Sequence, residues 1–439
     1  MSCKLPLRLS LCAAACLAAT AASAQRDEVR VIGQRLEETL PQELARYGNR
    51  LETVDRGALD IGGFNDVSQA LQMAAPNFYV APFSGPFDYM HCSLQGSRCQ
   101  DILFLIDGVR ITNRLYDTTT PLDTIPAHAI ERVEVLYGGQ GLFYGTQSAA
   151  GVVNIVTSSF RGEPAGNFEI GADGNSGTHL SADYRTGSGD HSVVLFASRD
   201  EADGFRSFRD ADYQPSAGDR ERGYEVLNVG VKYGYDLSDD SRITILYQHT
   251  DNELDYLLPY AVVSRFNERD EDLLTFKWDY SFGEGGDFYV KAYYHDWDTH
   301  WTDVRNVLAG GVVTGELDTQ FANAFWGFKD YGVTALARVT SGNVEYSAGY
   351  DYQRFWGNDE VWLIEDRTET AQAVYGQIRS SAQAFERSDV AFGVRYNTTT
   401  GSADGTVWTL SGRHDLTDSL YLRGQIGTSF RLPGADSPS

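Results

Sequence analysis

Residues 132–158 read RVEVLYGGQGLFYGTQSAAGVVNIVTS, and this stretch decides the fold. Two short apolar segments, residues 133–136 and 152–156, flank a glycine-rich segment. Glycine reaches backbone conformations that are closed to other residues, so the chain can turn sharply there and pack close to another surface. The pattern predicts two short strands on either side of a compact connection. Many hairpins have glycine-rich turns, so the fold depends on what surrounds this one.

The N-terminus has the pattern of a secretory signal peptide. Lys4 and Arg8 form a positive region, residues 9–22 an apolar region, and residues 22–24 a small-residue cleavage site. The apolar run is shorter than the roughly 20 residues that a bilayer-spanning helix needs. A lipoprotein signal is the alternative, but neither Cys12 nor Cys16 has both a leucine three places upstream and a small residue just before it. We therefore predict an exported protein.

The chain is strongly acidic, with a formal net charge of −25 at pH 7. This sign argues against non-specific binding to nucleic acid, which needs clustered Lys and Arg. No segment after residue 24 is apolar for long enough to be a transmembrane helix, and the mean hydropathy is negative. A soluble exported protein and a β-barrel would both have this average, because barrel strands alternate between apolar and polar residues.

Alternation with a period of two distinguishes these two classes. Phe276, Trp278 and Tyr280 fall on one face of a predicted strand, and Lys277 and Asp279 fall on the other. The same pattern, interrupted by a polar turn, recurs in three predicted hairpins: residues 276–294, 227–247 and 407–425.

Such segments give roughly a dozen strands between residues 165 and 431. They are longer than the strands of soluble sheets, and aromatic residues near their ends suit a membrane–water interface. Short turns alternate with long polar connections: Gly204–Gly223, Leu254–Glu268 and Thr302–Gln320. A soluble β-sandwich or propeller would explain neither the aromatic ends nor this asymmetry. We therefore predict a mainly β fold, a transmembrane antiparallel β-barrel.

Four pieces of the chain resemble a known family: LEETLP at 36–41, LIDGVR at 105–110, IERVEVL at 130–136 and YGTQSAAGVVNIVT at 144–157. Their order and spacing are similar to those of the plug domain of TonB-dependent outer-membrane receptors. The resemblance implies a signal peptide at 1–24, an α+β plug domain at 25–158 and a barrel domain at 159–439. It also implies location in the outer membrane of a Gram-negative bacterium.

The barrel pattern is shorter than the resemblance requires, because family barrels close with twenty-two strands. The terminal GTSFRLPGADSPS resembles a motif found midway through such barrels, so we expect a C-terminally truncated barrel. An open sheet in lipid would leave unpaired backbone groups at both edges. A closed barrel of twelve strands is the alternative, but it would be too narrow for a plug of about 130 residues.

The resemblance implies a receptor for TonB-energised uptake of a scarce ligand. Ferric siderophore is the expected cargo on family prevalence, and cobalamin, haem and oligosaccharide remain alternatives. The expected partners are TonB with its inner-membrane energising complex, outer-membrane lipid and the ligand, but not nucleic acid. A non-transporting truncated remnant is the rival from another class.

A short β-prone segment just behind the cleavage site resembles the TonB box, which pairs with TonB as an added strand. Its residues are Asp27, Glu28, Val29, Arg30 and Val31. A frayed terminus without function is the alternative.

Two predicted plug loops, residues 79–98 and 110–116, are the expected ligand contacts, because family plug loops of this region point outward. Aromatic rings would supply apolar walls, and arginines would hold anionic oxygens bidentately. The candidate residues are Tyr79, Phe87, Tyr89, Arg98, Arg110, Asn113, Arg114 and Tyr116. Two alternatives stay open: the rings fill the barrel lumen, and the arginines face water or pair with barrel acids. Arg132 and Glu134 are expected, by resemblance, to latch the plug to the barrel wall.

Cys92 and Cys99 are the cysteines left after processing. An even pair in an exported chain predicts a disulfide, because the periplasm is kept oxidising. Zinc is the rival, but two thiols without a second pair make a poor site. We predict no metal site and no cofactor. Without a convincing Ser/His/Asp set, carboxylate pair or phosphate loop, we also predict no enzyme.

Overall fold

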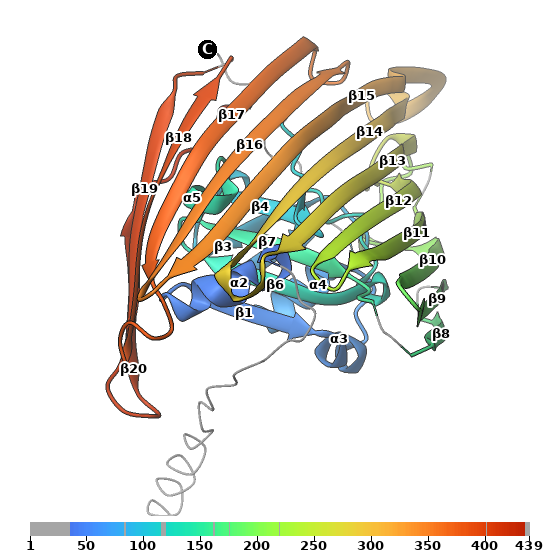
Figure 1. The fold of residues 1–439 in the computed structure, drawn as a ribbon. Helices are drawn as coiled ribbons and strands as arrows, with labels where there is room; N and C mark the ends of the chain where they lie inside the picture. The colour runs from blue at the N-terminus through green and yellow to red at the C-terminus, as the bar shows by residue number, and fades with distance from the viewer. Residues whose placement is uncertain are drawn as a thin grey trace, which may run out of the picture.

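The computed structural model describes residues 36–82, 85–115, 120–160, 163–174, 176–218, 220–400 and 402–434. Within these ranges the chain forms a small mixed domain that lies against the concave face of a large antiparallel sheet (Figure 1). The predicted mainly β fold class is thereby confirmed. The predicted signal peptide, residues 1–24, and the predicted TonB box, residues 27–31, lie outside the described residues.

The small domain, which we call the plug, is built on a five-stranded sheet with the order β1-β6-β7-β4-β5. Its strands are β1 (Arg50–Asp55), β4 (Ile102–Ile106), β5 (Val109–Arg110), β6 (Ile130–Tyr137) and β7 (Gly151–Thr157). The two apolar segments of the opening motif are β6 and β7, which pair antiparallel with Val133 opposite Ile155. A Cβ atom on Gly151 would collide with the Leu136 carbonyl, so the close approach of these strands requires glycine.

Short helices and a hairpin complete the plug. The helices are α2 (Leu36–Arg46), α3 (Arg56–Gly62), α4 (Val67–Ala74) and α5 (Gly141–Tyr144), with single 3₁₀ turns η1 (Cys99–Asp101) and η2 (Ala127–Ala129). Asp66 caps helix α4 by accepting a 3.0 Å hydrogen bond from the backbone N–H of Gln69. Strands β2 (Phe78–Pro82) and β3 (Met90–Leu94) pair as a hairpin. None of the described helices has the length and apolar character needed to cross a bilayer.

The large sheet has 13 strands in simple up-and-down order. Its first strands are β8 (Ala165–Ala172), β9 (Gly177–Ser188), β10 (His191–Phe205), β11 (Arg222–Ser238), β12 (Ser241–Asp255), β13 (Val262–Ser281) and β14 (Gly286–Ala309). The others are β15 (Val312–Ser341), β16 (Val344–Asp359), β17 (Ile364–Ser380), β18 (Ser388–Thr399), β19 (Gly405–Asp415) and β20 (Tyr421–Gly427), with the 3₁₀ turn η3 (Gly283–Gly285) before β14. In the described chain β8 and β20 are the two edges, so the sheet does not form the closed twelve-stranded alternative.

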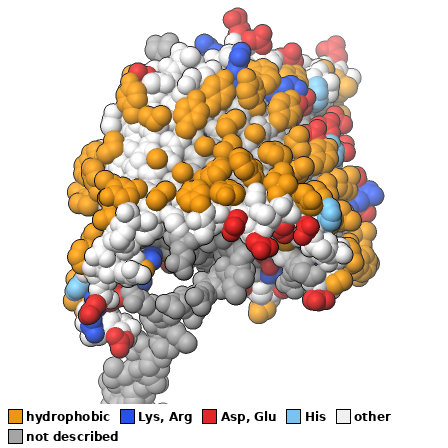
Figure 2. Space-filling model, in the orientation of Figure 1, with side chains coloured by type: hydrophobic (Ala, Val, Ile, Leu, Met, Phe, Trp, Pro, Cys, Tyr) orange, Lys and Arg blue, Asp and Glu red, His pale blue; other side chains and the backbone are white. Residues whose placement is uncertain are grey.

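The large sheet has an apolar outer face and a polar inner face, which is the reverse of the arrangement in a soluble protein. Phe276 and Trp278 on β13 point outward and are 46% and 37% exposed, whereas Lys277 and Asp279 between them face the plug and are buried. Apolar side chains spread over the outer face, with acidic side chains toward its margins (Figure 2). An apolar outer surface around a polar interior is the arrangement of a transmembrane barrel.

Two of the predicted long connections are wrong. Residues 254–268 and 302–320 are largely strand, because β12, β13, β14 and β15 continue through them. At the tip of the β14–β15 hairpin almost every residue from Val312 to Gln320 is exposed on both faces. Such a strand has no buried face, so its sequence carries no alternation. Of the three predicted long connections, the one at residues 206–221, between β10 and β11, lies outside the strands.

Candidate functional site

The two ends of the large sheet differ. At one end, which we call the turn end, short turns such as Gly189-Asp190 and Gly342-Asn343 join the strands. The other end, which we call the loop end, carries the connection at 206–221 and the tip of the β14–β15 hairpin, at the top right of Figure 1. Both predicted ligand loops of the plug contact the loop-end half of the wall, as their partners show.

The first predicted ligand loop is held by Arg222, the first residue of β11. Its guanidinium donates to the carbonyls of Pro86 (2.8 Å) and Phe87. Phe87 is completely buried against Tyr224, with ring centroids 5.0 Å apart. Phe87 therefore fills the space between plug and wall, which was the alternative prediction, and cannot contact a ligand in this arrangement.

The rest of this loop is more accessible. Tyr79 on β2 is 60% exposed, and Tyr89 is half-buried with its ring 5.6 Å from that of His91. The backbone N–H of Phe87 donates to the Asp66 carboxylate (3.0 Å), whose pKa is raised by burial. Tyr79 and Tyr89 are thus the aromatic members of the predicted set on this loop that a ligand could reach.

The three predicted anion-binding arginines do not converge, because each has a nearer partner. Arg98 is exposed and pairs with Asp101, with Nε 3.0 Å from the carboxylate. Arg110 turns into the plug, where its guanidinium donates to the carbonyls of Tyr144 and Thr146 (3.1 Å for the latter). Arg98, Arg110 and Arg114 therefore do not share one position, and contact of any of them with a ligand stays a prediction.

Arg114 follows the alternative prediction and pairs with a barrel acid. Its Nη2 lies 2.6 Å from the Glu369 carboxylate on β17, and its side chain is only 5% exposed. Asn113 is completely buried and accepts a 2.8 Å hydrogen bond from the backbone N–H of Leu115. Tyr116 lies outside the described residues. Arg114 and Asn113 therefore anchor this loop rather than present it to a ligand.

A second anchor lies further along the same part of the plug. Asp123 receives two hydrogen bonds from the Arg269 guanidinium on β13 (2.9 and 3.2 Å), and both side chains are buried. The same guanidinium stacks on Trp297 of β14, 4.0 Å from the ring centroid. Leu115 packs into the cluster formed by Trp297 and Phe328. The loop-end half of the wall thus holds the plug with buried charge pairs set among aromatic rings.

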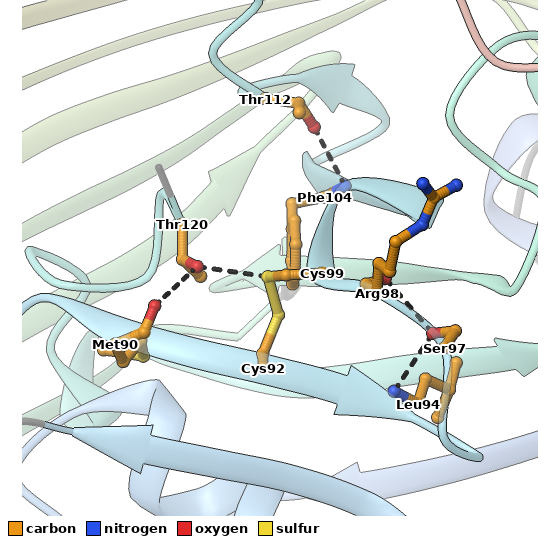
Figure 3. The surroundings of a disulfide bond; sticks show 9 residues. All are labelled: Met90, Cys92, Leu94, Ser97, Arg98, Cys99, Phe104, Thr112 and Thr120. Carbon is orange, nitrogen blue, oxygen red and sulfur yellow. Dashed lines mark hydrogen bonds between the residues drawn. A yellow bond between two sulfur atoms is a disulfide. The ribbon is translucent and has the colours of Figure 1, made fainter. Parts of the chain in front are cut away.

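Cys92 on β3 and Cys99 in η1 form a disulfide with their Cα atoms 4.9 Å apart (Figure 3). Thr120 contacts this region, because its hydroxyl lies 3.1 Å from the Cys99 sulfur and donates to the Met90 carbonyl (3.0 Å). The disulfide joins residues seven positions apart, and Cys92 belongs to the first ligand loop. No cluster of His, Cys, Asp and Glu suited to a metal ion occurs within the described ranges.

At the turn end, the acidic helix α2 pairs with basic side chains of the wall. Glu43 contacts both Arg338 on β15 and Arg379 on β17. Burial alone would raise the pKa of Glu43, but these two guanidiniums outweigh burial and lower it. Sequence reasoning missed this anchor, although the acidic LEETLP motif and the inward-facing Lys and Arg of the strands were visible signals.

Two lysines extend this contact. Lys277 on β13 lies 3.3 Å from Glu38, and Lys291 on β14 contacts Glu37. Arg132 and Glu134 do not take part, contrary to the prediction. They pair with each other (2.8 Å) inside the plug, where Glu134 also accepts hydrogen bonds from Gln42 and Asn154. They lie on β6, the second strand of the plug sheet, and line the space between plug and wall, whereas the ion pairs with the wall come from helix α2.

A cavity of about 530 Å³ lies between the plug and the wall. Helix α2, strand β5 and helix α5 line it from the plug, and β14, β16, β17 and β18 are among the wall strands that close it. Apolar and charged side chains mix on its surface. The sequence did not predict this cavity.

Comparison with protein families matches residues 45–152 to the TonB-dependent Receptor Plug Domain. The vitamin B12 transporter BtuB of Photobacterium profundum is 24% identical over 347 residues, which cover 77% of this chain and 52% of that protein. The probable TonB-dependent siderophore receptor PirA of Acinetobacter baumannii is 22% identical over 397 residues, 77% and 51% of the two chains. This chain therefore spans about half the length of the curated relatives it matches.

Solved structures show the same fold. The siderophore receptor PirA from Acinetobacter baumannii matches with a TM-score of 0.73 at 16% identity, over 92% of this chain and 63% of that one. A mutant of the ferric enterobactin receptor PfeA from Pseudomonas aeruginosa matches with a TM-score of 0.73 at 13% identity, over 90% and 64%. At this identity the likeness concerns the fold.

Proposed function

We propose, from the premise that this chain carries the plug domain of a TonB-dependent receptor beside a 13-stranded sheet, that it belongs to an outer-membrane receptor that takes up a ferric siderophore. The observation that carries the proposal is the plug seated on the polar face of a sheet whose other face is apolar. A wall with this polarity belongs in a bilayer, and a folded domain inside it blocks free diffusion. A blocked pore needs energy to pass a ligand.

The energy source in this proposal is TonB. The segment Asp27–Val31 would pair with TonB as an added strand, because it is short, β-prone and alternating. Helix α2 begins at Leu36, shortly after this segment. A pull on the segment would therefore act first on α2 and on its ion pairs with the wall, such as those of Glu43 with Arg338 and Arg379.

The cargo is proposed from the family and from the accessible plug surface. Tyr79 and Tyr89 offer accessible aromatic area on a loop whose Phe87 contacts the loop-end half of the wall. Relatives named as a siderophore receptor and as a vitamin B12 transporter both match the chain. Cobalamin is therefore the second candidate.

Uptake of radiolabelled ligands by cells that express the full gene product tests the proposal. A panel of ferric siderophores should include one that is bound and imported, and labelled cyanocobalamin should not compete with it. If cyanocobalamin alone is imported, cobalamin replaces siderophore as the cargo. If no ligand of either class is bound or imported, the receptor function itself is rejected in favour of a non-transporting remnant.

The Val29→Pro variant tests the energised step, because proline removes a backbone donor and blocks strand pairing. Surface binding of the ligand should persist while import falls to background. Val29→Thr is the matched control, since threonine keeps the N–H and the β-branched shape and should import normally. Normal import by Val29→Pro would show that this segment is not the TonB box.

A further inference from the structure

The cavity between plug and wall contains two arginines that approach each other. Arg110 comes from β5 of the plug, and Arg395 from β18 of the wall. Both Nη2 atoms lie beside Gly145, because a Cβ atom built there would be 2.8 Å from that of Arg395 and 3.2 Å from that of Arg110. Two guanidiniums this close repel each other unless negative charge lies near them.

The protein supplies only part of that negative charge. Arg395 Nη1 pairs with Asp351 (2.6 Å), and its Nε donates to the Asn397 side chain (2.7 Å). Arg110 has only backbone carbonyls as hydrogen-bond acceptors among the described residues. Within the same ranges no acceptor is found for Nη2 of Arg395, which lines the cavity. Burial lowers the pKa of the Arg110 guanidinium, so an anion beside it would relieve an existing cost.

Tyrosine hydroxyls add neutral donors to the same cavity. Tyr144 from α5, Tyr289 from β14 and Tyr375 from β17 all line it. Their hydroxyls make no hydrogen bond to any other described residue, although Tyr289 and Tyr375 are buried side chains. Burial raises the pKa of Tyr144 well above its usual value, which keeps its hydroxyl protonated and able to donate. Leu40 and Phe143 give the cavity apolar walls.

We propose that this cavity binds an anionic, oxygen-rich aromatic group, such as a catechol carboxylate, between Arg110 and Arg395. The guanidiniums hold the anionic oxygens, the tyrosine hydroxyls donate to the remaining oxygens, and Leu40 and Phe143 contact the ring. The site lies between the loop-end anchors of the plug and helix α2 at the turn end, so a ligand in transit would meet it after the outer loops. As a transit site it rests on the proposed function and restricts the cargo to anionic ligands.

Equilibrium binding to the purified full chain in detergent micelles tests the site without knowledge of the cargo. The two probes are dihydroxybenzoate and its uncharged amide, which have nearly the same shape and differ in charge. The acid should bind at one saturable site. The affinity for the amide should be lower by about tenfold or more, which is the effect expected when one charge-assisted hydrogen bond is lost. Equal binding of acid and amide, or no saturable binding of the acid, would overturn the proposal.

Variants locate the binding. Arg110→Gln and Arg395→Gln should each lower the affinity for the acid by about tenfold and leave the affinity for the amide unchanged. Arg185→Gln is the matched control, because Arg185 is also a buried wall arginine that pairs with a same-strand acid and with the plug, but it does not line the cavity. If Arg185→Gln lowers the affinity for the acid as much as Arg395→Gln does, the cause is a general loss of structure and the assignment fails.

The Arg395→Gln variant leaves Asp351 without its partner, so folding needs its own measurement. The double variant Arg395→Gln/Asp351→Asn removes both charges and should keep the thermal unfolding midpoint of the parent while it still binds the acid weakly. Tyr375→Phe keeps every charge and should lower the affinity for the acid less than the arginine variants do. If none of these folded variants loses affinity for the acid, the site is overturned. The proposed uptake is tested separately, by the import of radiolabelled ligands.

Discussion

Arg269→Met should release the loop-end anchor of the plug at a large cost in stability. Methionine keeps much of the packing on Trp297 but removes the charge, and Asp123, which is 2% exposed, is left buried without its partner. Breaking a buried pair on one side costs about 3–5 kcal/mol, because the remaining carboxylate is not solvated. The loss of the stacked cation adds about 1 kcal/mol or more. We expect a decrease of about 4–6 kcal/mol in the free energy of unfolding.

The assay is denaturant unfolding of the purified protein in detergent, followed by tryptophan fluorescence. In the double variant Arg269→Met/Asp123→Asn no charge is left buried, so part of the stability should return. Arg199→Met is the control, since Arg199 is half exposed on the outer face and pairs with exposed acids, and it should change stability by less than about 0.5 kcal/mol. A loss below about 1 kcal/mol for Arg269→Met, or a double variant less stable than the single one, would refute the reasoning.

Gly151→Ala should destabilise the plug by about 1–3 kcal/mol, because its Cβ would collide with the Leu136 carbonyl; thermal unfolding checks this, and Gly174→Ala, with open space around it, should be neutral. The lowered pKa of Glu43 means that its stabilisation is complete above its unfolded value of 4.5 and is lost as the pH falls through the lower folded-state pKa. Stability measured against pH should therefore decline less steeply at acid pH in Glu43→Gln than in the parent, and identical profiles would contradict this. Arg114→Ala should lower the free energy of unfolding by about 1–3 kcal/mol through the unpaired Glu369. A loss of cargo affinity at unchanged stability would restore Arg114 as a ligand contact.

The sequence predicted those features that local chemistry determines. The motif LIDGVR, quoted for its resemblance, holds Asp107-Gly108, residue types that tolerate the positive φ of 45° and 75° found at the turn of the β4–β5 hairpin. The three predicted hairpins of the large sheet form because each strand alternates between an apolar outer side chain and a polar inner one. Where both faces are exposed, as in residues 312–320, the alternation disappears and the strand was taken for a loop.

The candidate site was predicted less well because it depends on pairs that are distant in the chain. Arg114 and Glu369 are 255 residues apart, and nothing local in either segment indicates that they meet. Composition identified the arginines of the plug as unusual in an acidic chain. It could not show that Arg114 meets a wall carboxylate, that Arg98 pairs with Asp101 nearby, or that Arg110 reaches a cavity with Arg395.

The two anchors of the plug should respond differently to salt. At the turn end the acids of α2 are partly exposed, with Glu43 at 22% and Glu38 at 48%, so mobile ions can approach their partners. At the loop end Asp123 and Arg269 are 2% and 1% exposed. The screening length falls to about 3 Å at 1 M salt, and exposed pairs weaken far more than buried ones.

Hydrogen–deuterium exchange at low and high salt measures this difference. Amide exchange in α2 should accelerate in high salt, while exchange at residues 120–126 should change little, because their contact with Arg269 excludes ions. The difference in strength between the two anchors has a mechanical consequence for the proposed receptor. The α2 contacts lie nearest to the segment that TonB would pull, so the weaker anchor is the one that the force reaches first. Equal acceleration in both segments would show that burial does not rank the anchors and would remove this reason for the plug to yield from the turn end.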